Sequence, residues 1–400
     1  MPRAFLVVLD SVGIGGAPDA DRFFNGDLPD TGANTVGHIA QACAGLPRGP
    51  LRLPNLSGLG LGHAVHLASG EEASGLDGEI IGRWGAATEV SQGKDTPSGH
   101  WELAGVPVPF AWHYFPNKTP AFPDDISRAV AEAAGTEGIL GNCHASGTAI
   151  LDRLGAEHLS TGWPICYTSV DSVFQIAAHE ESFGLERLLA LCAEIAPRLH
   201  EMNVGRVIAR PFLGDARQGF SRTANRKDFA RLPPGPTLCD WVQTAGGAVY
   251  AIGKIGDIFS MQGITVAVKG RDADLMTHLH DAVADAEEGS LTFANFVEFD
   301  SEYGHRRDVE GYAAALEWFD RELGGLLKQL RSGDMLLITA DHGNDPTWPG
   351  TDHTRERVPV LVAGKGAGEI GQIGFVDVAA AISHHLGLSK RGPGASFLRD

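Results

Sequence analysis

The sequence predicts an α/β protein whose main sheet is mostly parallel and flanked by helices, with a smaller α/β domain inserted into it. Short, continuously apolar segments such as AFLVVL at 4–9 occur near both ends of the chain. Such segments are typical of strands buried on both faces of a parallel sheet. Between two of the late segments, residues 309–331 place apolar side chains every three or four positions, which indicates a long amphipathic helix. This strand–helix–strand order is typical of α/β sheets that carry their site at the carboxyl edge of the strands.

Four segments are the expected strands of the main sheet. They are AFLVVLD (4–10), which is followed by a glycine-rich turn, LTFANFVEFD (291–300), DMLLITADHG (334–343) and ERVPVLVAG (356–364). The helix between the second and the third has its apolar positions at 312, 316, 319, 323, 327 and 330. Carboxylates stand at the ends of the first three strands.

The length of 400 residues exceeds what one hydrophobic core usually supports, so two domains are expected. After about residue 110 the pattern changes to shorter units separated by prolines, with strands expected at 164–172 and 204–212 and a helix at 185–196. The segment RLPPGPT at 231–237 is typical of a linker that returns to the first domain. We therefore expect a catalytic core of 1–110 and 231–400, and an inserted cap domain of 111–230.

The composition narrows the class of protein. Hydrophobic residues make up 43% and charged residues 20%, as in ordinary globular proteins, and the formal net charge is -18. That charge disfavours nucleic acid and anionic membranes as partners. The five cysteines are widely spaced without a CxxC pair, which favours reduced thiols, and no apolar stretch is long enough to span a membrane. A cytoplasmic protein is expected.

Six side chains near the expected strand ends form a candidate metal site. They are Asp10, Asp300, His305, Asp341, His342 and His353. Taken singly, each aspartate is more simply a turn or helix cap, and each histidine an ordinary surface or core residue. Taken together, three carboxylates and three imidazoles form a mixed oxygen and nitrogen set that suits Mn²⁺ or Zn²⁺, and six ligands suffice for two ions.

The segment GKDTPSGHWE at 93–102 offers a candidate nucleophile, Thr96. A metal ion that lowers the pKa of the threonine hydroxyl would activate it. On this stretch alone, a helix-capping cluster of Ser and Thr is the simpler interpretation.

Several motifs, in order along residues 5 to about 360, carry a family resemblance. They are VVLDSVGIGGAPDA, GKDTPSGHWE, YTSVDSVFQIAAHEE, VGRVIARPF, FDSEYGHRRD and TADHGNDPTWPGTDHTRE. With them the chain resembles the phosphopentomutases of the alkaline phosphatase superfamily. The resemblance implies an alkaline-phosphatase-like core, two Mn²⁺ ions and a phosphothreonine that interconverts ribose 1-phosphate, or deoxyribose 1-phosphate, with the 5-phosphate through a 1,5-bisphosphate.

The resemblance also implies roles for individual residues. Thr96 would be the phosphorylated nucleophile, first charged by a sugar bisphosphate primer. One ion would be held by Asp10, Thr96, Asp341 and His342, and the other by Asp300, His305 and His353. The inserted domain would be a mobile cap that excludes water while the bisphosphate turns round.

Binding of the pentose phosphate is expected to involve further residues. They are Asp171, Arg210, Arg222, Arg226 and Lys254. Arginine suits bidentate phosphate binding, although surface ion pairs explain the arginines equally well, and Asp171 could equally cap a turn. The chain departs from the family pattern at Cys143, His144 and Ala149, none of which is a proposed ligand. A monomer that acts in nucleoside catabolism is expected.

Two alternatives remain open at the level of sequence. One is a related metal-dependent enzyme, a cofactor-independent phosphoglycerate mutase or a phosphatase, although those mutases use serine where Thr96 stands here. The other is a catalytically silent metal-binding or scaffold protein, which would have no need for Thr96 beside a full set of ligands.

Overall fold

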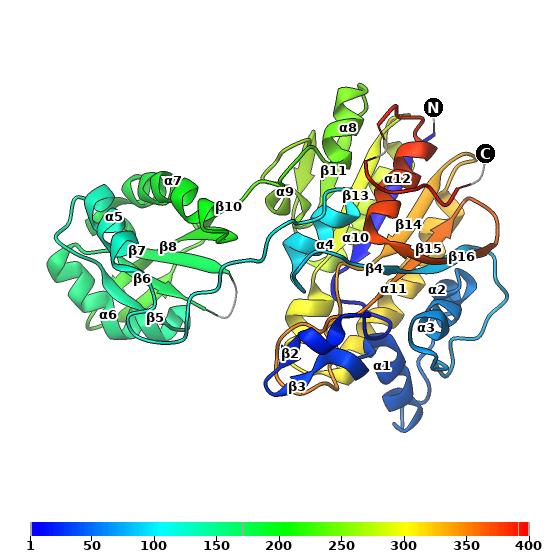
Figure 1. The fold of residues 1–400 in the computed structure, drawn as a ribbon, viewed down its shortest axis with the longest axis horizontal. Coiled ribbons are helices and arrows are strands. Elements are labelled where there is room, and N and C mark those ends of the chain that lie inside the picture. Colours follow the sequence, from blue (N-terminus) through cyan, green and yellow to red (C-terminus); the bar gives the residue numbers. More distant parts are fainter. Residues whose placement is uncertain (1, 170–171, 391, 399–400) are drawn as a thin grey trace. The chain divides into compact units, whose positions relative to one another are not determined.

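A computed structural model describes residues 2–169, 172–390 and 392–398 of the chain. The chain divides into two compact units, Met1–Pro109 with Pro233–Asp400, and Phe110–Leu232 (Figure 1). The first unit consists of two segments of the chain, and the second is the segment between them.

The first unit is built on an eight-stranded sheet with the strand order β12-β11-β13-β1-β14-β15-β4-β16. Its strands are β1 (Ala4–Leu9), β4 (Arg83–Thr88), β11 (Val249–Ile252), β12 (Val266–Val268), β13 (Leu291–Phe296), β14 (Met335–Thr339), β15 (Val358–Ala363) and β16 (Gly368–Gly374). A small hairpin of β2 (Phe24–Asn25) and β3 (Leu28–Pro29) lies outside this sheet.

The sheet is parallel except at β15, which runs antiparallel to both of its neighbours, β14 and β4. The amino end of β15 therefore lies at the same edge as the carboxyl ends of β1, β13 and β14. This direction explains why a residue that precedes β15 in the sequence can join residues that follow the other three strands.

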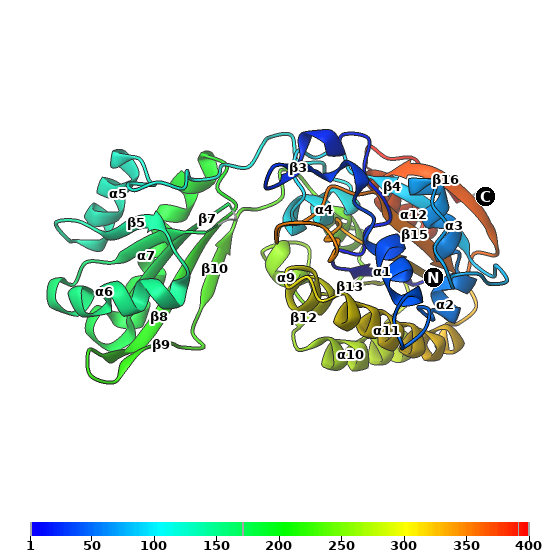
Figure 2. The same cartoon turned by 90° about the horizontal axis from the view of Figure 1, so that it is seen from below.

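Helices surround this sheet. They are α1 (Thr35–Ala44), α2 (Pro54–Gly58), α3 (Leu61–Ser69), α4 (Thr96–Leu103), α8 (Leu238–Thr244), α9 (Ile255–Ile258), α10 (Asp272–Asp285), α11 (Val309–Gln329) and α12 (Phe375–His385). Single helical turns cover Ala20–Arg22, Asp30–Gly32 and Phe299–Gly304. Figure 2 shows α10 beside α11, which it contacts.

Two aromatic side chains of β13 show that helices cover both faces of the sheet. Residues three apart on a strand point to opposite faces. Phe293 packs against Phe259, which follows α9, and against a histidine of α4, whereas Phe296 packs against Phe319 of α11. The central strands are consequently buried on both sides, as their apolar sequences predict.

Two sequence-based expectations, one about burial and one about a strand end, differ from the structure. The buried stripe of α11 includes Leu323 and Leu326, whereas Leu327, expected in the stripe, is only partly buried. Strand β13 ends at Phe296, so Asp300 is not at a strand end as expected but lies in the helical turn Phe299–Gly304. That turn brings Asp300 back over the edge of the sheet.

A buried ion pair ties the start of β1 to the start of β14. Arg3 Nε and a terminal guanidinium nitrogen donate to the two carboxylate oxygens of Asp334 at 3.0 and 2.6 Å, and both side chains are almost fully buried. Removal of one partner leaves a buried charge without compensation. We expect Arg3→Leu to lower the free energy of unfolding by about 3 kcal/mol, measured by urea denaturation.

The control for this variant is Lys269→Met in the same unit. Lys269 pairs with Asp257 at 2.7 Å, but both side chains are more than half exposed. An exposed pair contributes at most about 1 kcal/mol. Equal losses in the two variants would contradict the role assigned to burial.

The second unit has its own six-stranded sheet and hydrophobic core. Its strands are β5 (Leu140–His144), β6 (Ile165–Thr168), β7 (Val173–His179), β8 (Arg206–Asp215), β9 (Gly219–Arg222) and β10 (Lys227–Ala230). Its helices are α5 (Asp124–Ala134), α6 (Gly147–Thr161) and α7 (Leu185–Glu201), with a further helical turn at Glu180–Gly184. Side chains of α5, α7, β7 and β8 form a hydrophobic core within this unit. The unit therefore has a sheet and a core of its own.

Within the described residues, no helix combines the length and the apolar character needed to cross a membrane.

Candidate active site and metal centre

Four separate segments bring the six candidate ligands to one edge of the main sheet. Asp10 directly follows β1, and Asp341 and His342 follow β14. Asp300 lies in the helical turn after β13, and His305 is the residue that follows this turn. His353 lies in the loop before the antiparallel β15. This edge is where α/β sheets usually carry their ligands.

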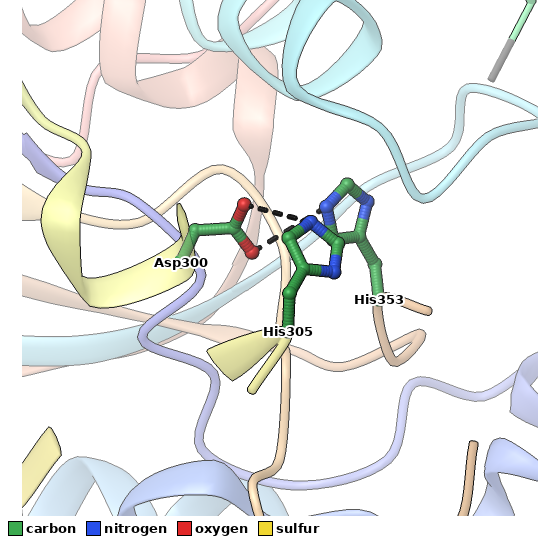
Figure 3. Close-up of side chains that lie close together, drawn as sticks. All are labelled: Asp300, His305 and His353. Carbon is green, nitrogen blue, oxygen red and sulfur yellow. Dashed lines mark ion pairs between the residues drawn. The ribbon is translucent and has the colours of Figure 1, made fainter. Parts of the chain in front are cut away.

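The carboxylate of Asp300 points toward two neighbouring imidazole rings, those of His305 and His353 (Figure 3). Its Oδ2 is 3.0 Å from His305 Nε2, and its Oδ1 is 3.4 Å from His353 Nε2. One donor atom of each of the three residues lies within 4.8 Å of the others, so the three could hold one cation together. The side-chain amide of Asn344 donates to Asp300 Oδ1 at 2.7 Å and fixes the carboxylate in this orientation.

A second group of donors adjoins the first and shares Asp300 with it. Donor atoms of Asp10, Asp300 and His342 also lie within 4.8 Å of one another. His342 Nε2 is 3.5 Å from Asp10 Oδ1 and 3.3 Å from Asp341 Oδ2, so Asp341 lies at this group as well. The rings of His342 and His353 stack with centroids 4.0 Å apart, which joins the two groups into one cluster.

All three imidazoles turn the same nitrogen toward the cluster. His305 Nδ1 lies 2.6 Å from the Thr351 carbonyl oxygen, and His342 Nδ1 lies 3.1 Å from that of Gly343. His353 Nδ1 lies 2.6 Å from the Lys94 carbonyl oxygen. A carbonyl only accepts, so each Nδ1 carries a proton and each Nε2 faces the carboxylates, where it could coordinate a cation. Metal-binding histidines are held in this way.

The electrostatics of the cluster calls for positive charge. Burial, together with the charges of Asp341 and Asp300, raises the pKa of Asp10 well above its usual value. Burial would also raise the pKa of Asp300, but His353 and His305 hold it well below that value. Burial lowers the pKa of His342 to about 4, so its imidazole stays neutral near pH 7 and is available as a ligand.

Two buried oxygens support the fit to a cation. Asp10 Oδ1 and Asp341 Oδ2 are both buried, and neither accepts a well-aligned hydrogen bond from a residue that the structure describes. Buried charged oxygens without a donor are costly unless an ion compensates them. Carboxylate oxygens and imidazole nitrogens at these separations are the donor set of a divalent cation such as Mn²⁺ or Zn²⁺.

Thr96 lies at the edge of the cluster as the first residue of α4. Its Oγ1 is 3.4 Å from His342 Nε2. Asp95 caps the helix by accepting a hydrogen bond from the Ser98 amide at 3.0 Å. The amino end of a helix favours negative charge, so an anionic group at this position would be stabilised.

Gly99 allows α4 to approach the end of β14 closely. A Cβ atom at this position would lie 2.2 Å from the carbonyl oxygen and 2.8 Å from the carbonyl carbon of Asp341. Backbone atoms cannot yield as a flexible side chain can, so Gly99→Ala would displace Thr96 from the cluster. We expect kcat to fall about 10²-fold, since displacements of 1 Å cost that much.

The matched control is Gly45→Ala at the end of α1. The nearest atom to a Cβ there is 3.6 Å away, an ordinary contact, and the backbone is in the right-handed helical region. Steady-state kinetics of both variants tests the point, and an unimpaired Gly99→Ala enzyme would contradict the close approach.

The expected substrate-binding residues fall in different parts of the chain. Lys254 follows β11 in the first unit, where it lines a cavity of about 400 Å³, and its charge lowers the pKa of Asp10 against the larger effect of burial. The second unit contains the three arginines Arg210, Arg222 and Arg226. Burial raises the pKa of Tyr167, and the charges of these arginines act to lower it. They therefore gather around one side chain. Asp171 lies outside the described residues.

Existing partners already engage two of these arginines. Arg210 Nε donates to Gln175 Oε1 at 3.0 Å, and Arg226 makes a bidentate pair with Asp228 at 2.7 Å. Arg222 approaches Gly147, where an added Cβ would lie 2.2 Å from a guanidinium nitrogen. This glycine leaves room for a guanidinium at the start of α6.

Two of the positions that depart from the family pattern make contacts inside the second unit. Arg153 donates to Cys143 Sγ at 3.0 Å, and His144 Nε2 lies 2.9 Å from the Phe115 carbonyl oxygen.

Sequence reasoning missed the polar residues that support the ligands. The backbone amide of Ser11 donates to Asp341 Oδ1 at 3.1 Å, and the side chain of Asn295 donates to Asp10 Oδ2 at 3.1 Å. Asn295 could have been noticed as a polar residue within the apolar strand LTFANF. Ser11 directly follows Asp10, and Asn344 follows His342 by two positions. Neither residue type by itself indicates a supporting role beside a candidate ligand.

Comparisons with known proteins identify the family. A phosphopentomutase of Methylobacterium sp. (strain 4-46) is 58% identical over 97% of this chain and 98% of its own length. A phosphopentomutase of Agrobacterium fabrum is 53% identical over the full length of both. The chain belongs to the phosphopentomutase family. A family model described as the Metalloenzyme superfamily matches residues 2–390, and the two groups of donor residues fit a divalent metal in this member of the phosphopentomutase family.

A solved structure shows the same fold at low sequence identity. The PH0037 protein from Pyrococcus horikoshii superposes with a TM-score of 0.50 and 13% identity over 97% of this chain and 98% of that chain. The expected α/β fold class of this phosphopentomutase family member, with a mostly parallel main sheet flanked by helices, is confirmed.

Proposed function

We propose that this chain is an intramolecular phosphotransferase that interconverts ribose 1-phosphate, or deoxyribose 1-phosphate, with the 5-phosphate through a phosphothreonine at Thr96. The observation that carries the proposal is the position of Thr96 Oγ1, 3.4 Å from His342 Nε2 at the edge of the ligand cluster, in a member of the phosphopentomutase family. A role in nucleoside catabolism, a cytoplasmic location and a monomeric state belong to the same proposal.

The cluster would hold two Mn²⁺ ions. Asp10, Thr96, Asp341 and His342 are assigned to one ion, and Asp300, His305 and His353 to the other. Because Asp300 also belongs to the group of Asp10 and His342, we expect it to serve both ions. When bound, such ions neutralise phosphoryl oxygens and lower the pKa of a nearby hydroxyl.

Thr96 carries the phosphoryl group between two hydroxyls of the sugar. The bond between phosphorus and Thr96 Oγ1 breaks as the free hydroxyl of the bound pentose monophosphate forms a new bond to phosphorus, and the hydroxyl proton passes to Thr96 Oγ1. The pentose 1,5-bisphosphate then presents its other phosphate. Thr96 Oγ1 forms a bond to that phosphorus, the bond between phosphorus and the sugar oxygen breaks, and the proton of the threonine hydroxyl passes to the sugar oxygen. A sugar bisphosphate would supply the first phosphoryl group. No phosphoryl group passes to water in this sequence.

Positive side chains would bind the anionic sugar phosphate. Lys254 lies near Asp10, where an ammonium group suits phosphate oxygens, and Arg210, Arg222 and Arg226 form the guanidinium cluster of the second unit. Guanidinium groups bind phosphate in a bidentate manner. Asp171 is proposed to accept hydrogen bonds from the sugar hydroxyls.

The direct test follows ribose 1-phosphate by phosphorus NMR with purified protein, Mn²⁺ and a trace of ribose 1,5-bisphosphate. We expect ribose 5-phosphate to accumulate with little inorganic phosphate, and intact mass to show a single phosphorylation. Release of inorganic phosphate as the main product would identify a phosphatase instead. Absence of any turnover, with metal still bound, would favour a silent metal-binding protein.

A further inference from the structure

A line of buried hydrogen bonds joins the helix of Thr96 to the carboxylates of the cluster, and the proposed function does not account for it. His100 lies on α4, one turn after Thr96, and Asn295 lies in the middle of β13. Both side chains are fully buried, at 0% exposure. Fully buried polar side chains are costly unless they are bonded, so this pair calls for an explanation.

The side-chain amide of Asn295 bridges a carboxylate and the imidazole. Its Nδ2 is 3.1 Å from Asp10 Oδ2 and 3.1 Å from His100 Nε2. On the other side of the ring, His100 Nδ1 is 2.9 Å from the carbonyl oxygen of Thr96. The same nitrogen is 3.1 Å from Asp341 Oδ2. The ring therefore lies between the nucleophile's backbone and two of the candidate ligands.

These contacts allow one arrangement of protons. As a metal ligand Asp10 would be ionised, and its carboxylate would then only accept, so Asn295 must turn an N–H toward it. The reversed amide would place Oδ1 against the carboxylate. The second N–H of the amide then points at His100 Nε2, which must accept. The ring proton is consequently on Nδ1, where the carbonyl of Thr96 accepts it. The amide thus fixes which ring nitrogen faces it as an acceptor and how the imidazole is oriented.

We propose that Asn295 and His100 are positioning residues that hold Thr96 at a fixed place relative to Asp10 and Asp341. Their contacts are with two candidate ligands and with the backbone of Thr96, so they act through those groups. The inference rests on the proposed function of Thr96 as the phosphorylated nucleophile. It extends that function by naming what ties the nucleophile's helix to the metal-binding carboxylates. Residues that support metal ligands typically contribute 10–100-fold in activity or affinity.

Two substitutions of His100 separate positioning from simple packing. The amide nitrogen of asparagine can take the place of Nδ1, whereas that of glutamine takes the place of Nε2. We expect His100→Gln to lower kcat about 10–100-fold with little change in KM, since the effect falls on the transition state. His100→Asn should recover most of the loss although it leaves the larger void. Equal kcat values in the two variants, or a loss in KM alone, would overturn the inference.

A second readout is independent of activity. Nitrogen-15 NMR of histidine-labelled protein, with the His100 signals assigned by their absence in His100→Asn, distinguishes a protonated ring nitrogen from a bare one. We expect a protonated Nδ1 and a bare Nε2 in the wild type, and loss of this single pattern in Asn295→Leu. A wild-type ring with its proton on Nε2 would overturn the inference. Asn295→Leu also provides a second kcat measurement should His100→Gln fail to fold.

The outcomes for the two proposals differ. A wild-type protein without mutase turnover contradicts the proposed function, whatever the variants do. A wild-type protein with mutase turnover, in which Asn295→Leu and His100→Gln keep full kcat, contradicts only the positioning role. Calorimetric titration of Mn²⁺ into each variant adds a third measure, in which Asn295→Leu should bind Mn²⁺ about 10–100-fold more weakly because Asp10 loses its support.

Discussion

Thr96→Ala should abolish mutase turnover while the protein still binds its metal ions. Removal of a covalent nucleophile costs on the order of 10⁴- to 10⁶-fold in kcat, because no other group can take up the phosphoryl group. The remaining ligands are carboxylates and imidazoles from four other segments, so metal stoichiometry should change little. Steady-state kinetics measures turnover, and elemental analysis measures the metal content. Intact mass after incubation with ribose 1,5-bisphosphate measures phosphorylation.

Ser98→Ala is the matched control, since it removes another hydroxyl from the same helical turn. Ser98 Oγ donates to Asp95 Oδ2 at 2.9 Å and so supports the helix cap, which contributes about 1 kcal/mol to stability. Turnover and phosphorylation should persist in this variant. A phosphorylated, active Thr96→Ala protein would show that another residue is the nucleophile.

Asp300→Asn should impair both metal positions, because Asp300 belongs to both groups of donors. The substitution keeps the size of the side chain and its hydrogen bond from Asn344, so the fold should survive. It removes the charge that two dications would share. Several kcal/mol of charge stabilisation depend on the ions, so kcat should fall on the order of 10³-fold or more. Titration calorimetry should show weaker binding at both positions.

Glu302→Gln serves as the control for Asp300→Asn. Glu302 belongs to the same helical turn, but its carboxylate pairs with Arg306 at 2.7 Å and is partly exposed. Removal of this charge should leave metal binding and kcat near those of the wild type. Loss of one ion only in Asp300→Asn would contradict a shared carboxylate, and near-normal turnover would contradict the metal assignment itself.

The fold class could be predicted, and the candidate ligands could be singled out, because both depend on local, repeated patterns. Continuous apolar runs predict buried strands, and the adjacent acidic and histidine residues after them stand out against that background. Asp341 and His342 follow β14 as expected. The direction of β15 could not be predicted, because a run of apolar residues does not reveal whether its strand is parallel or antiparallel to its neighbours. Yet that direction places His353 in the cluster.

The supporting residues could not be predicted for a different reason. His100 and Asn295 are ordinary residue types whose function depends on a contact between segments 195 positions apart. The apolar pattern predicts Asp300 at the end of a strand, but Asp300 reaches the cluster through a helical turn that this pattern does not reveal. Asp300 belongs to both groups of donors because of distances in the folded chain, which the sequence does not show.

Anomalous diffraction at the manganese edge, from crystals of the protein grown with Mn²⁺, tests the central claim most directly. We predict two peaks in each chain. One should lie among Asp10, Asp341, His342 and Asp300, next to Thr96, and the other among Asp300, His305 and His353. A single peak, or peaks away from these side chains in protein that retains mutase activity, would contradict the account.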